Sequence, residues 1–339
     1  MTKLDDNRLY WIDAIRSFAC LCVLLDHSVI PGGTQGREII APLQYFTVAG
    51  ASVLFFMISG ALVFNKPKPF VPFMKRRFLK IFLPMLIWTV IYLLICCFIN
   101  GIQWSQLPNA LVLMFFTPQF GTYWFIYVIF GIYLLTPMVA TWLEKCSRGD
   151  VRLLLLVGCL AMTIPYLGLI DNDFNKALHL ESGALYYFMG YLWICMMGYY
   201  IRRYVNITKF KWWHVLILLV VIALPLLLRW VGEPYKIIQK RTSINVVLLC
   251  ACYFIIIKHI KLSDRMKRVV YNFAQHSFGI YLVHKQIDNF ILDPIVNNLG
   301  MSYYVSIPFV FVTSLALSYI VVHLISKLPY SNYIIAYKS

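Results

Sequence analysis

Four ionisable side chains lie within one apolar stretch near the start of the chain, residues 11–30, namely Asp13, Arg16, Asp26 and His27. Ionisable residues are costly inside an apolar helix, so each of them is a candidate functional residue. His27 follows Arg16 by eleven positions, which corresponds to about 1100° of helical rotation, or three turns plus about 20°. We therefore expect both side chains on one helix face, about 16 Å apart along the axis.

This shared face indicates a polar path with a cation at one end and an imidazole deeper in. Imidazole suits proton transfer near neutral pH, because its ordinary pKa is about 6.5. Asp13 precedes Arg16 by three residues and can pair with and orient the guanidinium. Asp26 points about 100° away from His27 and should serve a different neighbour. Two alternatives stay open: Arg16 extends to the lipid headgroups, and His27 forms only an interhelical hydrogen bond.

The composition indicates an integral membrane protein. Of 339 residues, 61% are hydrophobic and 13% charged, with a mean hydropathy of +0.73, whereas soluble domains are about 45–50% apolar and about 25% charged. A soluble body of this size has too little interior to bury so much apolar surface. The same numbers exclude disorder, fibrous repeats and a small disulfide scaffold.

Apolar segments long enough to span a bilayer, which takes about 20 residues, recur along the chain. We expect an all-α polytopic membrane protein of about ten transmembrane helices, with a short interfacial or re-entrant piece at 111–116 that cannot span. The expected spans are 11–30, 46–64, 81–99, 123–141, 151–170, 183–201, 212–229, 243–258, 269–291 and 305–326.

The net charge of +16 follows the topology. With the N-terminus in the cytoplasm, the inner segments hold 22 Lys and Arg and the outer loops six, as the positive-inside rule requires, and both termini are cytoplasmic. We expect no nucleic-acid partner, because no basic folded module is present. The first span should act as an uncleaved signal-anchor. We expect one membrane domain over residues 1–339 without an appended soluble domain.

Metal binding is not expected. Six of the nine cysteines form closely spaced pairs inside apolar spans, at 20 and 22, 96 and 97, and 250 and 252. Residues one or two apart point to different sides of a helix, so they make poor chelating pairs. Buried cysteine behaves as a small hydrophobe.

Arg16 and His27, with ten residues between them, match the R-X10-H motif of the acyltransferase-3 family of integral membrane O-acyltransferases. Four further segments resemble the family's motifs in order: VLFFMISGAL (53–62), KRRFLKIFLP (75–84), YWFIYVIFGIYLLTP (123–137) and SFGIYLVH (277–284). The resemblance covers nearly the whole chain and includes its length and helix count. Some members carry an appended esterase-like domain, which we do not expect here.

The resemblance implies transfer of an acyl group, commonly acetyl, from cytoplasmic acyl-CoA to a sugar hydroxyl of a cell-surface glycan or its lipid-linked precursor. The implied setting is a bacterial-type inner membrane, with acyl-CoA, a saccharide acceptor and membrane lipid as partners. A sugar hydroxyl needs its proton removed as it attacks a thioester, and a general base supplies about 10²–10⁴-fold in rate. We expect His27 to be that base. A covalent acyl-imidazole intermediate is the alternative.

Acyl-CoA is a polyanion and should approach from the basic side. Arg76, Arg77 and Lys80 lie in a cationic run where the third span begins, and arginine offers bidentate contacts to phosphate. We expect these residues to bind the nucleotide, although ordinary positive-inside anchoring is the alternative. The pantetheine arm would then extend from Arg16 towards His27, over about 16 Å.

Four other polar or aromatic residues are candidates for the acceptor site or channel: Ser59, Trp124, His284 and Glu181. Each has a plainer interpretation. Ser59 would hydrogen-bond across helices at the close approach that Gly60 allows, and Trp124 would anchor the helix at the interface. His284 would be a satisfied structural histidine, and Glu181 would lie in a solvated loop.

The alternative function is a carrier, either a glycan exporter or a small-solute transporter that uses Arg16, Asp26 and His27 as a polar pathway. A carrier should work without acyl-CoA and tolerate the loss of a base at position 27, whereas a transferase should not. A purely structural partner is a third possibility, disfavoured by the cost of keeping Arg16 and His27 in one span.

Overall fold

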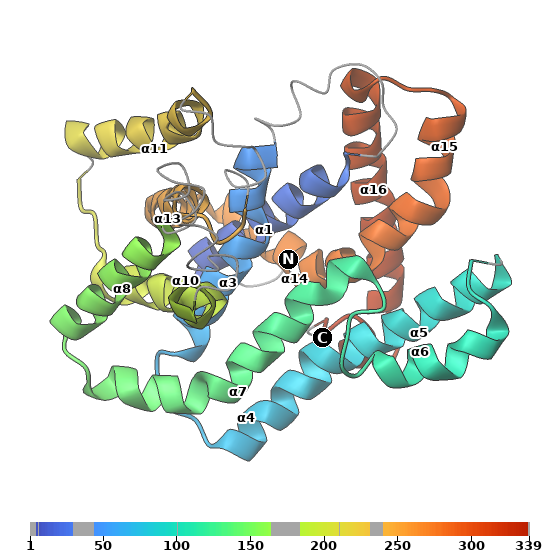
Figure 1. The fold of residues 1–339 in the computed structure, drawn as a ribbon, viewed down its shortest axis with the longest axis horizontal. Helices are drawn as coiled ribbons and strands as arrows, with labels where there is room; N and C mark the ends of the chain where they lie inside the picture. Colours follow the sequence, from blue (N-terminus) through green and yellow to red (C-terminus); the bar gives the residue numbers. More distant parts are fainter. Residues whose placement is uncertain are drawn as a thin grey trace. The chain divides into compact units, whose positions relative to one another are not determined.

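A computed structural model of the protein describes residues 5, 7–29, 44–99, 101–163, 184–209, 211–230 and 240–337. Over these ranges the chain forms helices and connecting segments and contains no strand (Figure 1). The predicted all-α class is confirmed.

Each segment predicted to span the membrane coincides with a helix or a run of helices. They are α1 (Tyr10–His27), the run Gln44–Val63 that ends in α3 (Leu54–Val63), α4 (Phe70–Arg77) joined through a π-helical turn to α5 (Leu83–Phe98), α7 (Trp124–Lys145), α8 (Arg148–Thr163), α10 (Ala184–Tyr204), α11 (Trp212–Trp230), α13 (Ile244–His259), α14 (Asp264–Ile287) and α16 (Tyr303–Ser326). Shorter helices are α6 (Leu107–Leu113), α15 (Asp293–Asn298) and α17 (Ser331–Ile334). The part of the fifth predicted span after residue 163 lies outside the described residues.

Four of these helices are long and apolar enough to cross a membrane by length and composition: Gln44–Val63, Phe70–Phe98, Gly121–Lys145 and Tyr303–Ser326. They support the polytopic membrane class. The short helix α6 agrees with a segment near 111–116 that cannot span. The cytoplasmic location of both termini remains a prediction.

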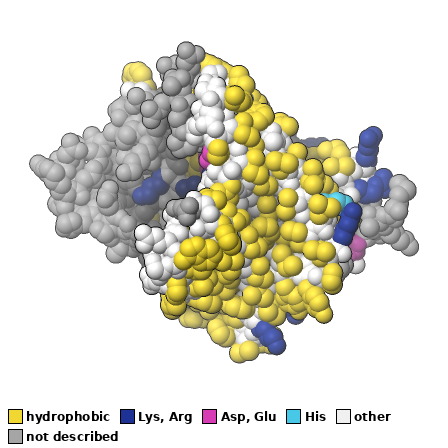
Figure 2. All heavy atoms as spheres, turned by 90° about the vertical axis from the view of Figure 1, so that its right-hand side faces the viewer, with side chains coloured by type: hydrophobic (Ala, Val, Ile, Leu, Met, Phe, Trp, Pro, Cys, Tyr) yellow, Lys and Arg dark blue, Asp and Glu magenta, His cyan; other side chains and the backbone are white. Residues whose placement is uncertain are grey.

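The described residues expose many apolar side chains. Hydrophobic side chains cover most of the described part of the face drawn in Figure 2, with few charged groups among them. Helix α16 alone exposes Val305, Val312, Ile320 and Leu324, each by more than half of its surface. Apolar cover of this extent is typical of a surface that contacts lipid.

The chain divides into two compact units. Unit 1 comprises Met1–Asp26, Glu38–Pro67 and Met138–Lys267. Within it, α3 and α10 pack closely because each presents a glycine to the other's backbone. A Cβ added at Gly60 would overlap the carbonyl oxygen of Cys195, and one added at Gly198 would overlap that of Met57. Small residues let helix backbones approach in this way, so the close approach predicted at Gly60 is confirmed.

The end of α10 in unit 1 is capped by a lysine from α13. The last carbonyls of a helix lack partners within the helix. Lys258 Nζ donates to the carbonyl oxygens of Ile201 at 3.0 Å and Arg202 at 3.2 Å. Arg202 in turn donates to the carbonyl oxygen of Ala61 at 2.6 Å, which ties α10 to α3.

Unit 2 comprises His27–Arg37, Lys68–Pro137 and Arg268–Ser339. Most of α14 from Ala274 onward is buried in it. The indole of Trp88 in α5 donates to the carbonyl oxygen of Ile334 in α17 at 3.0 Å, so the C-terminal segment is held against α5. These contacts fix the part of the chain that carries the candidate site.

Candidate active site

Two predicted site residues, His27 and His284, meet within unit 2. His27 is the last residue of α1, and its Nδ1 lies 2.8 Å from Nε2 of His284 in α14, which is hydrogen-bond distance. The ring planes differ by 2° and the ring centroids are 5.1 Å apart. Because the two nitrogens are much closer than the centroids, the rings meet edge to edge. An N–H on one ring therefore points along the lone pair of the other.

His284 is held from its other side by its own helix. The residue has 0% exposure. Its Nδ1 lies 2.9 Å from the carbonyl oxygen of Tyr281 and 3.1 Å from that of Ile280. The preceding turn of α14 thus sets the orientation of the imidazole, while Nε2 is directed at His27.

The turn of α14 around His284 is braced by neighbouring elements of unit 2. The hydroxyl of Tyr123 donates to the carbonyl oxygen of Leu282 at 2.7 Å. Gln286 Nε2 donates to that same hydroxyl at 3.0 Å and to the carbonyl oxygen of Trp88 at 3.3 Å. Tyr281 donates its hydroxyl hydrogen to the carbonyl oxygen of Thr122. Buried hydrogen bonds of this kind hold a side chain in one orientation.

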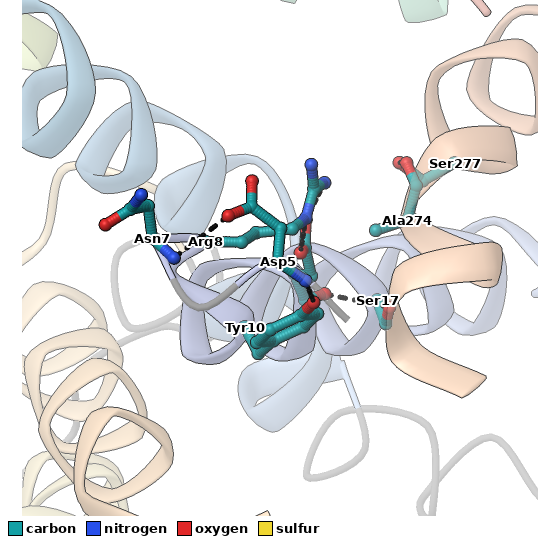
Figure 3. Close-up of polar contacts among 8 residues, drawn as sticks. Asp5, Asn7, Arg8, Tyr10, Ser17, Ala274 and Ser277 are labelled. Carbon is teal, nitrogen blue, oxygen red and sulfur yellow. Dashed lines mark hydrogen bonds and ion pairs between the residues drawn. The ribbon is translucent and has the colours of Figure 1, made fainter. Parts of the chain in front are cut away.

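Helix α1 is uninterrupted from Tyr10 to His27, so the helical spacing derived for Arg16 and His27 applies. Its start is organised by Asp5 and Arg8 (Figure 3). The backbone N–H of Asp5 donates to the hydroxyl of Tyr10 at 2.9 Å. Arg16 is partly exposed.

Asp13 pairs with Arg8, a residue that precedes α1. Arg8 donates from Nε to one carboxylate oxygen at 2.7 Å and from Nη2 to the other at 3.0 Å. Asp13 is buried, at 3% exposure, and such a bidentate pair is the strong form of this interaction. That Asp13 also orients Arg16 remains a prediction.

Asp26 serves a neighbour other than His27, as its direction on the helix predicts. One of its carboxylate oxygens lies 3.9 Å from Arg241 Nη2 within unit 1. The Asp26 side chain is 10% exposed and that of Arg241 is 38% exposed. Solvent therefore reaches the ion pair and partly screens the attraction between the two charges.

The predicted nucleotide-binding residues occupy the helical run from α4 into the π-helical turn Phe78–Phe82. Arg76 and Lys80 are exposed. The Arg77 guanidinium lies over the rings of Phe73 and Tyr133, at 5.1 and 4.9 Å from their centroids, a cation–π arrangement. Among the described residues, Arg77 Nε has no hydrogen-bond partner.

The remaining predicted acceptor residues are scattered. Ser59 is partly exposed in α3, within unit 1. Trp124 is partly exposed at the start of α7, within unit 2, with its ring 6.3 Å from that of Phe125. Glu181 lies outside the described residues.

A further charged group, Lys285, follows His284 directly and was not among the predicted site residues. Lys285 Nζ lies 4.0 Å from Asp288 and 3.9 Å from Asp293. Asp288 is buried, at 1% exposure. The spacing of Lys285 and Asp288 at i and i+3 on a helix was the available signal. Within the described ranges, no three His, Cys, Asp or Glu side chains gather where they could hold a metal ion.

The fold and the site together define a polytopic α-helical membrane protein that carries a histidine pair inside one of its two compact units. The family model described as an acyltransferase domain matches residues 9–323. The chain therefore belongs to the acyltransferase-3 family. Comparisons with curated proteins and with solved structures each gave no significant match.

Proposed function

We propose that this protein is a membrane O-acyltransferase of bacterial-type inner membranes. It takes an acyl group, expected to be acetyl, from cytoplasmic acyl-CoA. The group passes to a hydroxyl of a cell-surface glycan or of its lipid-linked precursor. The family supports acyl transfer in general, and the resemblance described above supports the donor and acceptor.

The observation that carries the proposal is the contact between His27 and His284. A general base must be held in a fixed direction to take a proton from a weak nucleophile. His284 is itself fixed by two carbonyl oxygens of α14, so it can hold the His27 ring in turn.

The proposed step is direct attack on the thioester. The acceptor hydroxyl gives its proton to an unprotonated nitrogen of His27 while its oxygen bonds to the thioester carbonyl carbon. The tetrahedral intermediate then collapses, the carbon–sulfur bond breaks, and the CoA thiolate takes the proton back from His27. The products are the acyl ester and CoA thiol, and His27 returns to its starting state.

The basic residues supply the donor site. Arg76 and Lys80 are exposed and Arg77 keeps a hydrogen-bond donor without a partner among the described residues. Arginine binds phosphate in bidentate fashion. We assign these three side chains to the nucleotide phosphates and Arg16 to the donor path along α1.

The test is transfer of radiolabelled acetyl from acetyl-CoA to membrane glycan, with wild type, His27→Ala and the control His276→Ala. His276 is also a buried histidine of unit 2, and it is bonded to the preceding turn of α14 at Asn272. We expect wild type and His276→Ala to transfer label and His27→Ala to lose about 10²-fold or more.

Two outcomes contradict the proposal. Equal labelling by wild type and His27→Ala excludes His27 as the base. Glycan export without any labelled product, from wild type and variant alike, excludes acyl transfer from acetyl-CoA and favours the carrier.

A further inference from the structure

The hydrogen-bond partners of His284 determine which of its nitrogens carries hydrogen. Its Nδ1 lies within 3.1 Å of two backbone carbonyl oxygens, those of Ile280 and Tyr281. A carbonyl oxygen can only accept, so Nδ1 must be the N–H of His284. In a neutral imidazole the other nitrogen, Nε2, then carries the lone pair.

A doubly protonated His284 would be an imidazolium with 0% exposure. Burying a charge without a paired opposite charge is strongly unfavourable. The neighbouring residue Lys285 is itself a cation, and it lies near Asp288 and Asp293. The neutral form with the hydrogen on Nδ1 is the one that this environment favours.

Another histidine of the chain, His259, independently shows the same arrangement. Its Nδ1 lies 2.7 Å from the carbonyl oxygen of Ile255, one turn earlier in α13. Its Nε2 accepts a hydrogen bond from the backbone N–H of Ile207 at 2.9 Å. A backbone N–H can only donate, so Nε2 of His259 carries the lone pair. A helix carbonyl at Nδ1 and a donor at Nε2 thus select one tautomer.

The tautomer of His284 in turn determines the tautomer of His27. The lone pair on His284 Nε2 faces His27 Nδ1 at 2.8 Å, so a hydrogen must lie between them and His27 Nδ1 must supply it. The hydrogen of a neutral His27 then sits on Nδ1, and its lone pair sits on Nε2.

We propose that His284 is a positioning residue that fixes His27 in the tautomer with its lone pair on Nε2. Through His284, the backbone carbonyls of Ile280 and Tyr281 determine which nitrogen of His27 acts as the base. The proposal deepens and rests on the proposed function, since it assigns the proton-accepting atom of the same site. A neutral histidine takes the orienting part that a carboxylate plays in the serine-protease triad.

The first test is kinetic and uses acetyl transfer by His284→Gln, His284→Leu and the control His276→Leu. The amide oxygen of glutamine can accept a hydrogen bond near the position of His284 Nε2, whereas leucine cannot. We expect His284→Leu to lower kcat by about tenfold or more, up to the 10²–10⁴-fold that a general base supplies. The KM for acetyl-CoA should stay within about twofold, and His284→Gln should keep most of the rate.

His276→Leu removes another buried histidine of α14. The Nε2 of His276 has no hydrogen-bond partner among the described residues. The variant should therefore keep wild-type kcat. A loss in His284→Gln as large as in His284→Leu, or an equal loss in His276→Leu, would overturn the positioning role and indicate a packing role.

The second test reads the tautomer directly by nitrogen-15 NMR of histidine-labelled protein. The chain has seven histidines, so the His27 signals are assigned by their absence in His27→Gln. We expect wild-type His27 to show a protonated Nδ1 and an unprotonated Nε2, and His284→Leu to show a mixture of tautomers. The reverse assignment in wild type would overturn the proposal.

Different results would contradict the proposed acyl transfer and the positioning role of His284. If wild type transfers no acetyl group, the proposed function fails, and the NMR spectrum still decides whether His284 sets the tautomer. If transfer requires His27 but the spectrum is the same in wild type and His284→Leu, the function stands and the positioning role is wrong.

Discussion

The ionisable side chains of α1 differ in the partners that they have. Both oxygens of Asp13 are bound by Arg8, and Asp26, next to His27 in sequence, lies 3.9 Å from Arg241. His27 is instead directed by His284 at 2.8 Å. Because the orienting group is uncharged, the pair requires no buried carboxylate and avoids its desolvation cost.

We predict that Arg16→Ala weakens the binding of acyl-CoA. Losing a hydrogen bond between charged groups costs about 1.5–3 kcal/mol, which corresponds to about a 10- to 100-fold rise in KM for acetyl-CoA. Arg16→Lys should recover part of this loss because it keeps the charge but not the bidentate geometry. An unchanged KM in Arg16→Ala, with altered folding or insertion only, would assign Arg16 to the lipid headgroups.

We predict that Tyr123→Phe destabilises the fold and slows acyl transfer. The change removes the hydroxyl that joins Leu282 and Gln286, which leaves a buried carbonyl oxygen and an amide with one partner fewer. We expect a loss of about 1–3 kcal/mol, measured as a lower midpoint of thermal unfolding in detergent. A midpoint equal to that of wild type would show that this brace is not needed to hold α14.

At the scale of helices, the amino-acid sequence predicts which residues share one helix. It does not predict which residues of other helices they contact. The common face of Arg16 and His27 is predictable because both lie in one helix, α1, whose geometry is regular. The sequence also predicts a helix over 269–291, which corresponds to α14 although α14 is rich in polar residues. The contact of His284 with His27 is not predictable, because it joins positions 257 residues apart and no local pattern reports such a pairing.

The partner of Asp13 shows the same limit on a shorter length scale. A helical spacing of three favours Arg16, but Arg8 lies before the first turn of α1 and folds back onto the carboxylate. The backbone N–H of Arg8 donates to the carbonyl oxygen of Asp5 at 3.0 Å, which shapes this turn. Rules for pairs within a helix do not describe a chain that turns before the helix begins.

We predict that Gly198→Ala disrupts the contact between α3 and α10. The new methyl group would overlap the carbonyl oxygen of Met57, and a backbone atom cannot move aside as a flexible side chain can. Overpacking of this kind costs about 1–3 kcal/mol, seen as a lower unfolding midpoint.

The matched control for that change is Gly131→Ala in α7. A Cβ at Gly131 would have nothing within 4 Å, so the alanine should raise stability by about 0.5–1 kcal/mol through its helix propensity. A midpoint of Gly198→Ala that equals or exceeds that of wild type would show that the close approach of α3 and α10 does not contribute to stability.

For the whole molecule, the distribution of apolar side chains is the main distinction from a soluble protein. Exposed apolar residues in α16 and elsewhere would be a liability in water, and they are appropriate in lipid. Several of the positive charges lie within helices, among them Arg76 and Arg77 in α4 and Arg202 in α10, and Lys258 shows that such a cation can cap a neighbouring helix.

We predict that Val312→Arg in α16 impairs membrane insertion although Val312 is 61% exposed. An arginine at the centre of a spanning helix costs about 2.5–3.5 kcal/mol, whereas an exposed substitution in a soluble protein usually changes stability by about 0.5 kcal/mol or less. Glycosylation mapping of insertion into microsomes measures the effect, with Val312→Leu as control. Normal insertion of Val312→Arg would place this face of α16 away from lipid.

The separation of His27 and His284 in the sequence determines when the pair can form during synthesis. The two residues are 257 residues apart, and at a synthesis rate of about 5–20 residues per second the ribosome needs roughly 13–50 s to pass from one to the other. During that interval α1 is already made while His284, the partner of its last residue, does not yet exist. The His27–His284 contact can therefore form only after most of the chain has been made, so its formation marks nearly complete synthesis.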